Sequence, residues 1–164
     1  MTLYYSYENN PYKAFEYAKM LNDEFPDNPT FERWKGRISA RKGDYASASE
    51  IFKDVLLKAD SGYTGYTALP AIREATYYVA LQYNNTNEPD SSEYYFNKCI
   101  GYSKEIDKDE ESGFWINSVL YLGMINDKSG NRGKALDYYN ELLEMKEYGS
   151  SHSLAKKYIE HPYH

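Results

Sequence analysis

One pattern of residue types recurs four times along this chain. The pattern begins with a small residue, and a second small residue follows 12 positions later. The third residue, 4 positions further on, is aromatic in three of the four occurrences and Ala in the other, and an apolar residue follows it by 3. The four occurrences are Thr2, Ala14, Ala18, Leu21; Gly36, Ala48, Phe52, Val55; Ala80, Ser92, Phe96, Cys99; and Gly123, Ala135, Tyr139, Leu142. An internal repeat of this period restricts the chain to folds that stack one supersecondary unit upon the next.

The spacing of these residues indicates pairs of α-helices joined by short turns. Two small residues 12 apart fit the closest approach of two helices joined by a short turn, because small side chains let the backbones come together. We expect the end of a first helix at 2–8, followed by helices at 11–25, 29–42, 45–59, 69–86, 89–105, 111–129, 132–146 and 151–160. Prolines open first turns at 11, 29, 70 and 89. Asn28, Asp44 and Asn131 are predicted N-caps, and Gly43 and Gly130 suit turns with positive φ.

The segments "YLGMINDKSGNRGKALDYYNELLEM" and "WKGRISARKGDYASASEIFKDVL" resemble the tetratricopeptide repeat family. The resemblance covers nearly the whole chain. It implies an all-α, right-handed solenoid of antiparallel helix hairpins with a C-terminal capping helix. We predict a single domain over 1–164. The sequence leaves open whether this domain is the whole protein or a fragment of a longer one. Its parts are a partial repeat at 1–28, repeats at 29–60, 69–105 and 111–147, and a capping helix at 150–161.

The repeats are unevenly spaced. Gly36 follows Thr2 by 34 residues, whereas the next two steps, to Ala80 and to Gly123, are 44 and 43. The extra residues fall in "ADSGYTGYTALPA" and "SKEIDKDEESG". Each segment is expected to lengthen the helices or to form a loop at one edge of the solenoid.

Composition narrows the range of partners. The formal net charge of −6 argues against nucleic acid or an anionic membrane surface as the main partner. No apolar run approaches the roughly 20 residues that span a bilayer, so a soluble chain is expected. The chain has 20 Tyr but only 6 Phe, which favours many half-buried rings with hydroxyls at the surface. The compartment is not indicated.

The sequence offers little for catalysis, and no cofactor or metal is predicted. The three His residues lie in the C-terminal part, where "HPYH" is interpreted as a solvated tail. "DKDEESG", from Asp107, lacks the Gly and Glu of a calcium loop and is interpreted as a solvated acidic loop. Cys99 takes an apolar position, which indicates a buried, inert thiol. No pair of titratable groups is spaced for acid–base work, so the chain is not expected to be an enzyme.

A row of three arginines is the strongest candidate for binding. Arg33, Arg37 and Arg41 are four residues apart and share one helix face. In tetratricopeptide proteins the first helix of each pair lines a concave groove, so the resemblance implies that this face looks into it. The corresponding or adjacent positions of the later repeats complete the predicted groove: Tyr77, Leu81, Asn84, Asn85, Asn117, Leu120, Met124 and Lys128.

Such a groove suits an extended acidic or aromatic peptide, because Arg binds carboxylates and Asn satisfies peptide groups. The competing interpretation is a solvated face whose arginines pair with nearby acids, for which Glu32 and Glu74 are candidates. The hypothesis is that these acids satisfy the row only in part and leave Arg37 free.

The sequence therefore predicts a non-catalytic scaffold or adaptor that binds a protein or peptide in its concave groove. The alternative is self-association, as a homodimer through the N-terminal layer, where Leu3, Tyr4 and Tyr7 would be uncovered.

Overall fold

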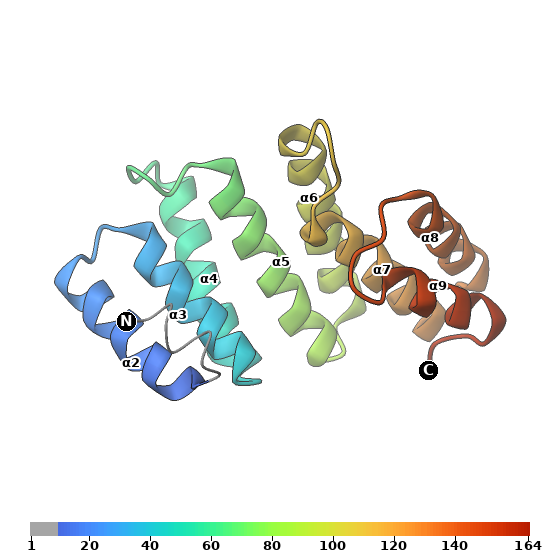
Figure 1. Cartoon of the computed structure of the whole chain (residues 1–164), viewed down its shortest axis with the longest axis horizontal. Helices are drawn as coiled ribbons and strands as arrows, with labels where there is room; N and C mark the ends of the chain where they lie inside the picture. The colour runs from blue at the N-terminus through green and yellow to red at the C-terminus, as the bar shows by residue number, and fades with distance from the viewer. Residues whose placement is uncertain (1–9) are drawn as a thin grey trace.

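The computed structural model describes residues 10–164, and every regular element in that range is an α-helix (Figure 1). The helices are α2 (Pro11–Glu24), α3 (Pro29–Arg41), α4 (Tyr45–Asp60), α5 (Leu69–Asn85), α6 (Pro89–Ile106), α7 (Gly113–Lys128), α8 (Arg132–Glu144) and α9 (Ser151–Glu160). All eight expected helices in this range are confirmed to within about two residues at each end. The expected helix at 2–8 lies outside the described residues, as do Leu3, Tyr4 and Tyr7.

Local signals explain where these helices begin and end. The Asn28 side chain accepts a hydrogen bond from the Thr30 N–H at 3.0 Å, and Asp44 does the same for Ser47 at 3.0 Å. Asn131 stands at the N-cap of α8, but its side chain makes no capping bond. Gly43 and Gly130 have φ of 80° and 77°, as the turns between paired helices require.

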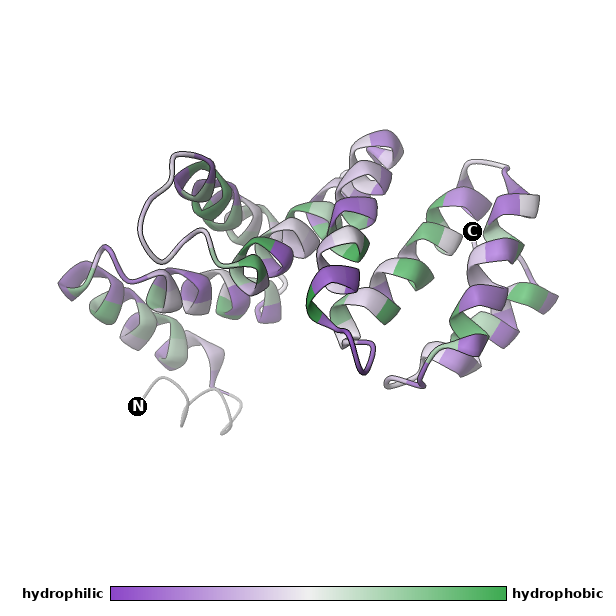
Figure 2. Ribbon diagram, turned by 90° about the horizontal axis from the view of Figure 1, so that it is seen from above, coloured by the Kyte–Doolittle hydropathy of each residue, from purple (hydrophilic) through white to green (hydrophobic). Residues whose placement is uncertain are grey.

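The helices form a curved stack of hairpins. Each helix packs against the next along the chain, and α3, α5, α7 and α9 also touch one another in order. The second helices of the hairpins lie further apart: among the described helices, α4 makes no comparable contact with α6, and α6 makes none with α8. The side formed by α3, α5, α7 and α9 is therefore the inner, concave one. Both views place the N-terminal and C-terminal helices at opposite ends of the molecule (Figures 1 and 2).

The repeated small residues lie where paired helices cross, as predicted. A Cβ atom on Gly36 would come within 2.6 Å of the Phe52 ring, and one on Gly123 would collide with the Tyr139 ring. At the middle crossing, Ser92 donates a hydrogen bond to the Ala80 carbonyl at 3.0 Å. The small residues are thus required by the aromatic side chain of the partner helix.

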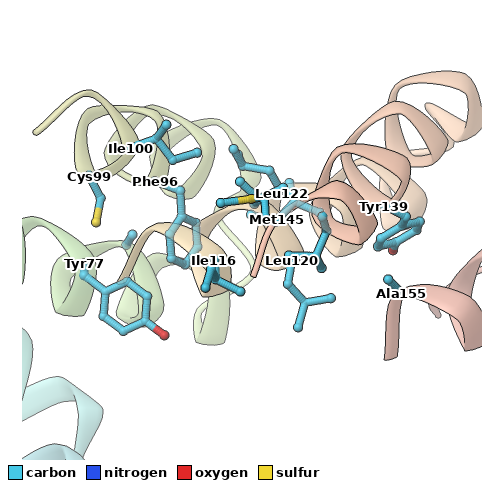
Figure 3. Close-up of a cluster of buried hydrophobic side chains, with 14 of the residues drawn as sticks. Tyr77, Phe96, Cys99, Ile100, Ile116, Leu120, Leu122, Tyr139, Met145 and Ala155 are labelled. Atoms are coloured by element: carbon cyan, nitrogen blue, oxygen red, sulfur yellow. The ribbon is translucent and has the colours of Figure 1, made fainter. Parts of the chain in front are cut away.

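That aromatic side chain also joins one hairpin to the next. Phe52 stacks on Tyr78 with ring centroids 4.6 Å apart, and Phe96 stacks on Tyr121 at 5.1 Å. Tyr139 meets Tyr158 of α9 at 5.8 Å in a tilted arrangement. The Tyr139–Tyr158 contact shows that α9 packs on the α7–α8 hairpin in the same way as the first helix of one hairpin packs on the hairpin before it. These contacts lie within the buried clusters, one of which is shown in Figure 3.

The two long connections both extend a helix and form a loop. Residues 61–68 form a loop that inserts Tyr66, which is fully buried and donates a hydrogen bond to Glu32 at 2.5 Å. Glu32 also binds Lys58, with N–O distances of 2.9 and 3.1 Å. The segment from Asp107 is less solvated than expected, since Asp107 is half-buried and pairs with Arg73 at 2.7 Å.

The C-terminal tail was expected to be solvated, and that interpretation is wrong for Tyr163. Its backbone N–H donates to the Asp127 carboxylate at 2.9 Å, and its ring meets Tyr158 at 5.1 Å. The Asp127 side chain is fully buried and also accepts hydrogen bonds from Arg132 and from the Tyr139 hydroxyl. Among residues 10–164, no helix is long and apolar enough to cross a membrane.

Candidate functional site

The arginine row lies at the junction of α3 and α5 on the concave side. Arg33 donates from Nε to Glu74 Oε2 at 2.7 Å, and Arg37 donates from Nη2 to the same oxygen at 2.8 Å. Arg37 Nε also pairs closely with Glu74 Oε1. The Glu74 side chain is only 1% exposed, whereas that of Arg37 is 42% exposed. One buried carboxylate therefore holds two guanidinium groups.

This arrangement corrects two details of the sequence prediction. The hypothesis that Arg37 is left free is wrong, because Glu74 binds it through two nitrogens. Glu32 does not pair with the row, since its carboxylate is taken by Lys58 and Tyr66. Arg41, at the exposed end of α3, is not without contacts either. Two positive charges sharing one negative charge leave an excess of one positive charge at the α3–α5 junction.

A pocket of about 400 Å³ opens between α5 and α7. Two predicted groove residues, Tyr77 and Asn117, line it. The other lining residues are Arg73, Tyr78, Ser112, Gly113, Phe114 and Tyr148. We call this the α5–α7 pocket. Its size is within the range of small-ligand sites, and aromatic rings make up most of its large side chains.

The polar groups of the pocket have spare hydrogen-bonding capacity. Within the described part of the chain, the hydroxyls of Tyr77 and Tyr78 and the side-chain amide of Asn117 have no hydrogen-bond partner. Burial, with the Glu74 carboxylate nearby, raises the pKa of Tyr78 to about 12. Burial also raises the pKa of Tyr77 well above its usual value. Both phenols are protonated at neutral pH, as an unperturbed Tyr also is, and each can donate one hydrogen bond and accept others.

Interactions between α5, the 107–112 loop and α7 fix the pocket wall. Arg73 Nη1 donates to Asp107 at 2.7 Å and to the Ser112 hydroxyl at 3.3 Å. The guanidinium lies over the Phe114 ring, 5.1 Å from its centroid, and Phe114 in turn meets Tyr77 edge-on at 5.3 Å. Although burial acts in the opposite direction, hydrogen bonds from Ser112 and Arg73 lower the pKa of Asp107. These contacts hold α7 at a set distance from α5.

Tyr148 reaches the pocket from the connection between α8 and α9. Its ring packs over Gly113, where a Cβ atom would lie 2.5 Å from Tyr148 Cζ. About half of the side chain stays exposed, so Tyr148 forms an open rim. Sequence reasoning missed Tyr148 because it lies outside the helices that carry the repeat. The one sequence signal for this contact is Gly113, because a residue without a side chain at the start of a helix leaves room for a ring to pack against the backbone.

The remaining predicted groove residues are spread along the same surface. Leu81 and Leu120 were predicted to line the groove, but both are buried, and Met124 packs against the same cluster, so these side chains belong to the core beneath the concave side. Figure 3 shows Tyr77 and Leu120 on the side of that cluster away from Ile100. Asn84 and Lys128 line a second cavity of about 270 Å³ between the C-terminal ends of α5 and α7. Asn85 is exposed beside it.

The described residues also bear on catalysis and metal binding. Cys99 is a buried thiol, as expected, and burial raises its pKa to about 11. In residues 10–164, no three His, Cys, Asp or Glu side chains are placed to hold a metal ion.

Comparisons with known proteins bear on the fold. No protein-family model and no curated protein sequence matches the chain. It is similar to a crystal structure of MamA, with a TM-score of 0.67 and 17% identity over 89% of this chain and 74% of that chain. A structure of MamA from residue 41 to the end, from Desulfovibrio magneticus RS-1, is 16% identical over 88% of this chain and 90% of that one, with a TM-score of 0.43. The first similarity shows an all-helical, tetratricopeptide-like solenoid.

Proposed function

We propose that this chain is a non-catalytic protein- or peptide-binding scaffold, or the adaptor part of a longer protein, that uses its concave surface. The α5–α7 pocket is the observation that carries the proposal. It lies between two first helices of the hairpins, and it holds Tyr77 and Asn117 with unused hydrogen-bonding groups. An amide and phenols of this kind satisfy the backbone groups of a bound peptide.

The charge preference of the groove follows from Glu74. Because Glu74 neutralises one of two arginines, the groove offers one excess positive charge at the α3–α5 junction in place of a row of three. We propose a preference for acidic partners that is modest and weakens with salt, since Arg37 is partly exposed to solvent.

An unselected peptide-display library tests the proposal. Selected peptides should bind the wild-type chain and lose affinity for an Asn117→Trp variant, whose larger side chain fills the pocket. The control is Tyr94→Ala on α6, an exposed residue that lines none of the cavities described above. The proposal fails if no peptide is enriched, or if every enriched peptide binds the Asn117→Trp variant as well as wild type.

Self-association is a second candidate, favoured by the surface of α2. Tyr12 is 70% exposed and Met20 is 62% exposed on this first described helix. Exposed apolar side chains on one helix face favour contact with a second copy. Light scattering over a range of concentrations would detect it. A Met20→Lys variant should abolish a dimer, whereas Leu57→Lys on α4, at a site 64% exposed, should not.

A further inference from the structure

A third cavity lies at the edge of the solenoid where α2 and α4 end, and we call it the edge cavity. It has a volume of about 560 Å³, and its lining residues are 24–29 together with Thr64 and Gly65. The α2–α3 connection and the 61–68 loop thus form its two sides, next to each other at one edge of the N-terminal half (Figure 1). The edge cavity shares no lining residue with the α5–α7 pocket.

The inserted 61–68 loop gives the edge cavity a fixed wall. This loop belongs to the first of the two segments that lengthen the spacing of the repeat. Gly65, with φ of 86°, packs so closely on Pro29 that a Cβ atom there would lie 3.3 Å from the proline Cγ. Next to it, the buried Tyr66 donates to Glu32 at 2.5 Å. The cavity is therefore preformed, and an insertion ordered in this way at the surface is typical of a functional loop.

Apolar surface lines much of the edge cavity. Pro26 and Pro29 contribute to it, and Phe25 lines it while remaining 48% exposed. The other five phenylalanines of the chain are buried or half-buried. Tyr63, next to the lining residue Thr64, is 55% exposed. Exposed rings beside a cavity favour the binding of an apolar side chain of a partner.

The charge around the edge cavity is negative throughout. The segments 20–32 and 59–72 contain no Lys or Arg, and their five acidic residues are Asp23, Glu24, Asp27, Glu32 and Asp60. Glu32 is bound by Lys58 and Tyr66. The other four carboxylates are exposed, and within the described part of the chain they form no ion pair. A positively charged ligand complements this surface.

Three of these carboxylates stand at helix ends that disfavour them. Asp23 and Glu24 lie in the last turn of α2, and Asp60 ends α4. The C-terminal end of a helix carries a partial negative charge, so it favours a cation and disfavours a carboxylate. Asp27 differs, because it precedes α3, and a carboxylate is favourable at a helix start. The stability of the fold therefore does not account for Asp23, Glu24 and Asp60, whereas a cationic ligand does.

We propose that the edge cavity docks a basic segment of a partner polypeptide, in which arginine or lysine flanks an apolar side chain. The apolar side chain packs against Phe25, and the basic residues face Glu24 and Asp27. This site prefers the opposite charge to the concave groove. The inference does not depend on peptide binding in that groove.

Fluorescence anisotropy with short labelled peptides, capped at both ends, tests the charge and the apolar contact separately. The probe has alternating Arg and Leu. One matched peptide replaces each Arg by Glu, and the other replaces each Leu by Ser. We expect the Arg–Leu peptide to bind about tenfold more tightly than either at low salt, with the affinity falling as salt is added. Equal binding of either matched peptide overturns the inference.

Variants of the chain place the peptide in the edge cavity. Glu24→Gln combined with Asp60→Asn removes two charges at nearly constant size and should weaken binding about fivefold. Glu50→Gln is the control, because Glu50 is exposed on α4 and lies outside the cavity. Phe25→Ala should weaken binding by a similar factor, and Tyr94→Ala, at a site 54% exposed, is its control. Thermal melting verifies that each variant is folded.

Three outcomes would overturn the inference. The first is that the Glu24→Gln, Asp60→Asn double variant and Phe25→Ala both bind the Arg–Leu peptide as wild type does. The second is that Ca²⁺ displaces the peptide while NaCl of equal ionic strength does not, since the carboxylates would then form a cation site. The third is that Asn117→Trp abolishes binding, because the peptide would then occupy the concave groove. Unchanged binding by Asn117→Trp supports a separate site, whatever the groove itself binds.

Discussion

Substitution of Glu74 by Gln is expected to destabilise the solenoid more than any exposed charge substitution. The Glu74 side chain is 1% exposed and binds both Arg33 and Arg37. Removing one partner of a buried ion pair typically costs about 3–5 kcal/mol, because the remaining charge is left buried without compensation. Here Arg37 is 42% exposed and can be hydrated, which places the expected cost near the lower end, at about 3 kcal/mol.

Thermal and urea unfolding, followed by circular dichroism, measure this cost. For a chain of this length, 1 kcal/mol lowers Tm by about 2–4 °C, so we expect Tm to fall by about 6–12 °C. Glu93→Gln is the control, since Glu93 pairs with Lys134 and both side chains are substantially exposed. Its expected cost is below about 1 kcal/mol.

A double-mutant cycle with Arg37→Gln separates the pair from the effects of each single change. We expect a coupling energy of about 1–2 kcal/mol, because Arg33 still holds Glu74 when Arg37 is gone. If Glu74→Gln costs no more than Glu93→Gln, or if the coupling vanishes, the Glu74 pairing is not the link between α3 and α5.

Three further predictions concern packing, pH and local stability. Gly123→Leu should cost about 1–3 kcal/mol by overpacking, whereas Gly101→Leu, at an open helical site, should cost nothing measurable in urea unfolding. Because the folded pKa of Asp107 lies below its usual value of 3.8, its stabilising contribution is complete above that pH and is lost as pH falls further. Asp107→Asn should therefore lose less stability in acid than wild type does. Hydrogen exchange should be fastest in α2, since α3 is the only described helix against which it packs extensively; uniform protection in a monomer would contradict this.

The helices were predictable because their signals are local. Asn28 and Pro29 mark the start of α3, and Gly43 marks the turn after it, each within a few residues of the feature it determines. The crossings were predictable for a different reason. A small residue and its aromatic partner recur at a constant separation, so Gly36 and Phe52 identify each other without any knowledge of the remaining structure.

The loops were less predictable, because burial there depends on contacts far along the chain. The 61–68 loop contains two tyrosines in similar surroundings, yet Tyr63 is exposed and Tyr66 is fully buried. What distinguishes them is Glu32, which lies 34 residues earlier and accepts the hydrogen bond from Tyr66. In the same way, the acidic composition around Asp107 did not indicate that its carboxylate is paired, because its partner Arg73 is 34 residues away.

The arginine row illustrates why a charge pattern in the sequence does not by itself indicate which charges are available in the fold. A row of arginines on one helix is visible in the sequence, but its availability depends on Glu74, which is 37 residues from Arg37. In a stack of hairpins, each first helix lies beside the next, so charges facing the groove meet charges of the following repeat before they meet a ligand. The Tyr77 and Tyr78 hydroxyls find no such partner among the described residues, and the Tyr77 ring is in contact with three other rings. What stays available to a ligand is therefore the capacity that neighbouring repeats leave unsatisfied, and among the described residues that line the α5–α7 pocket this capacity includes the phenols of Tyr77 and Tyr78 and the amide of Asn117.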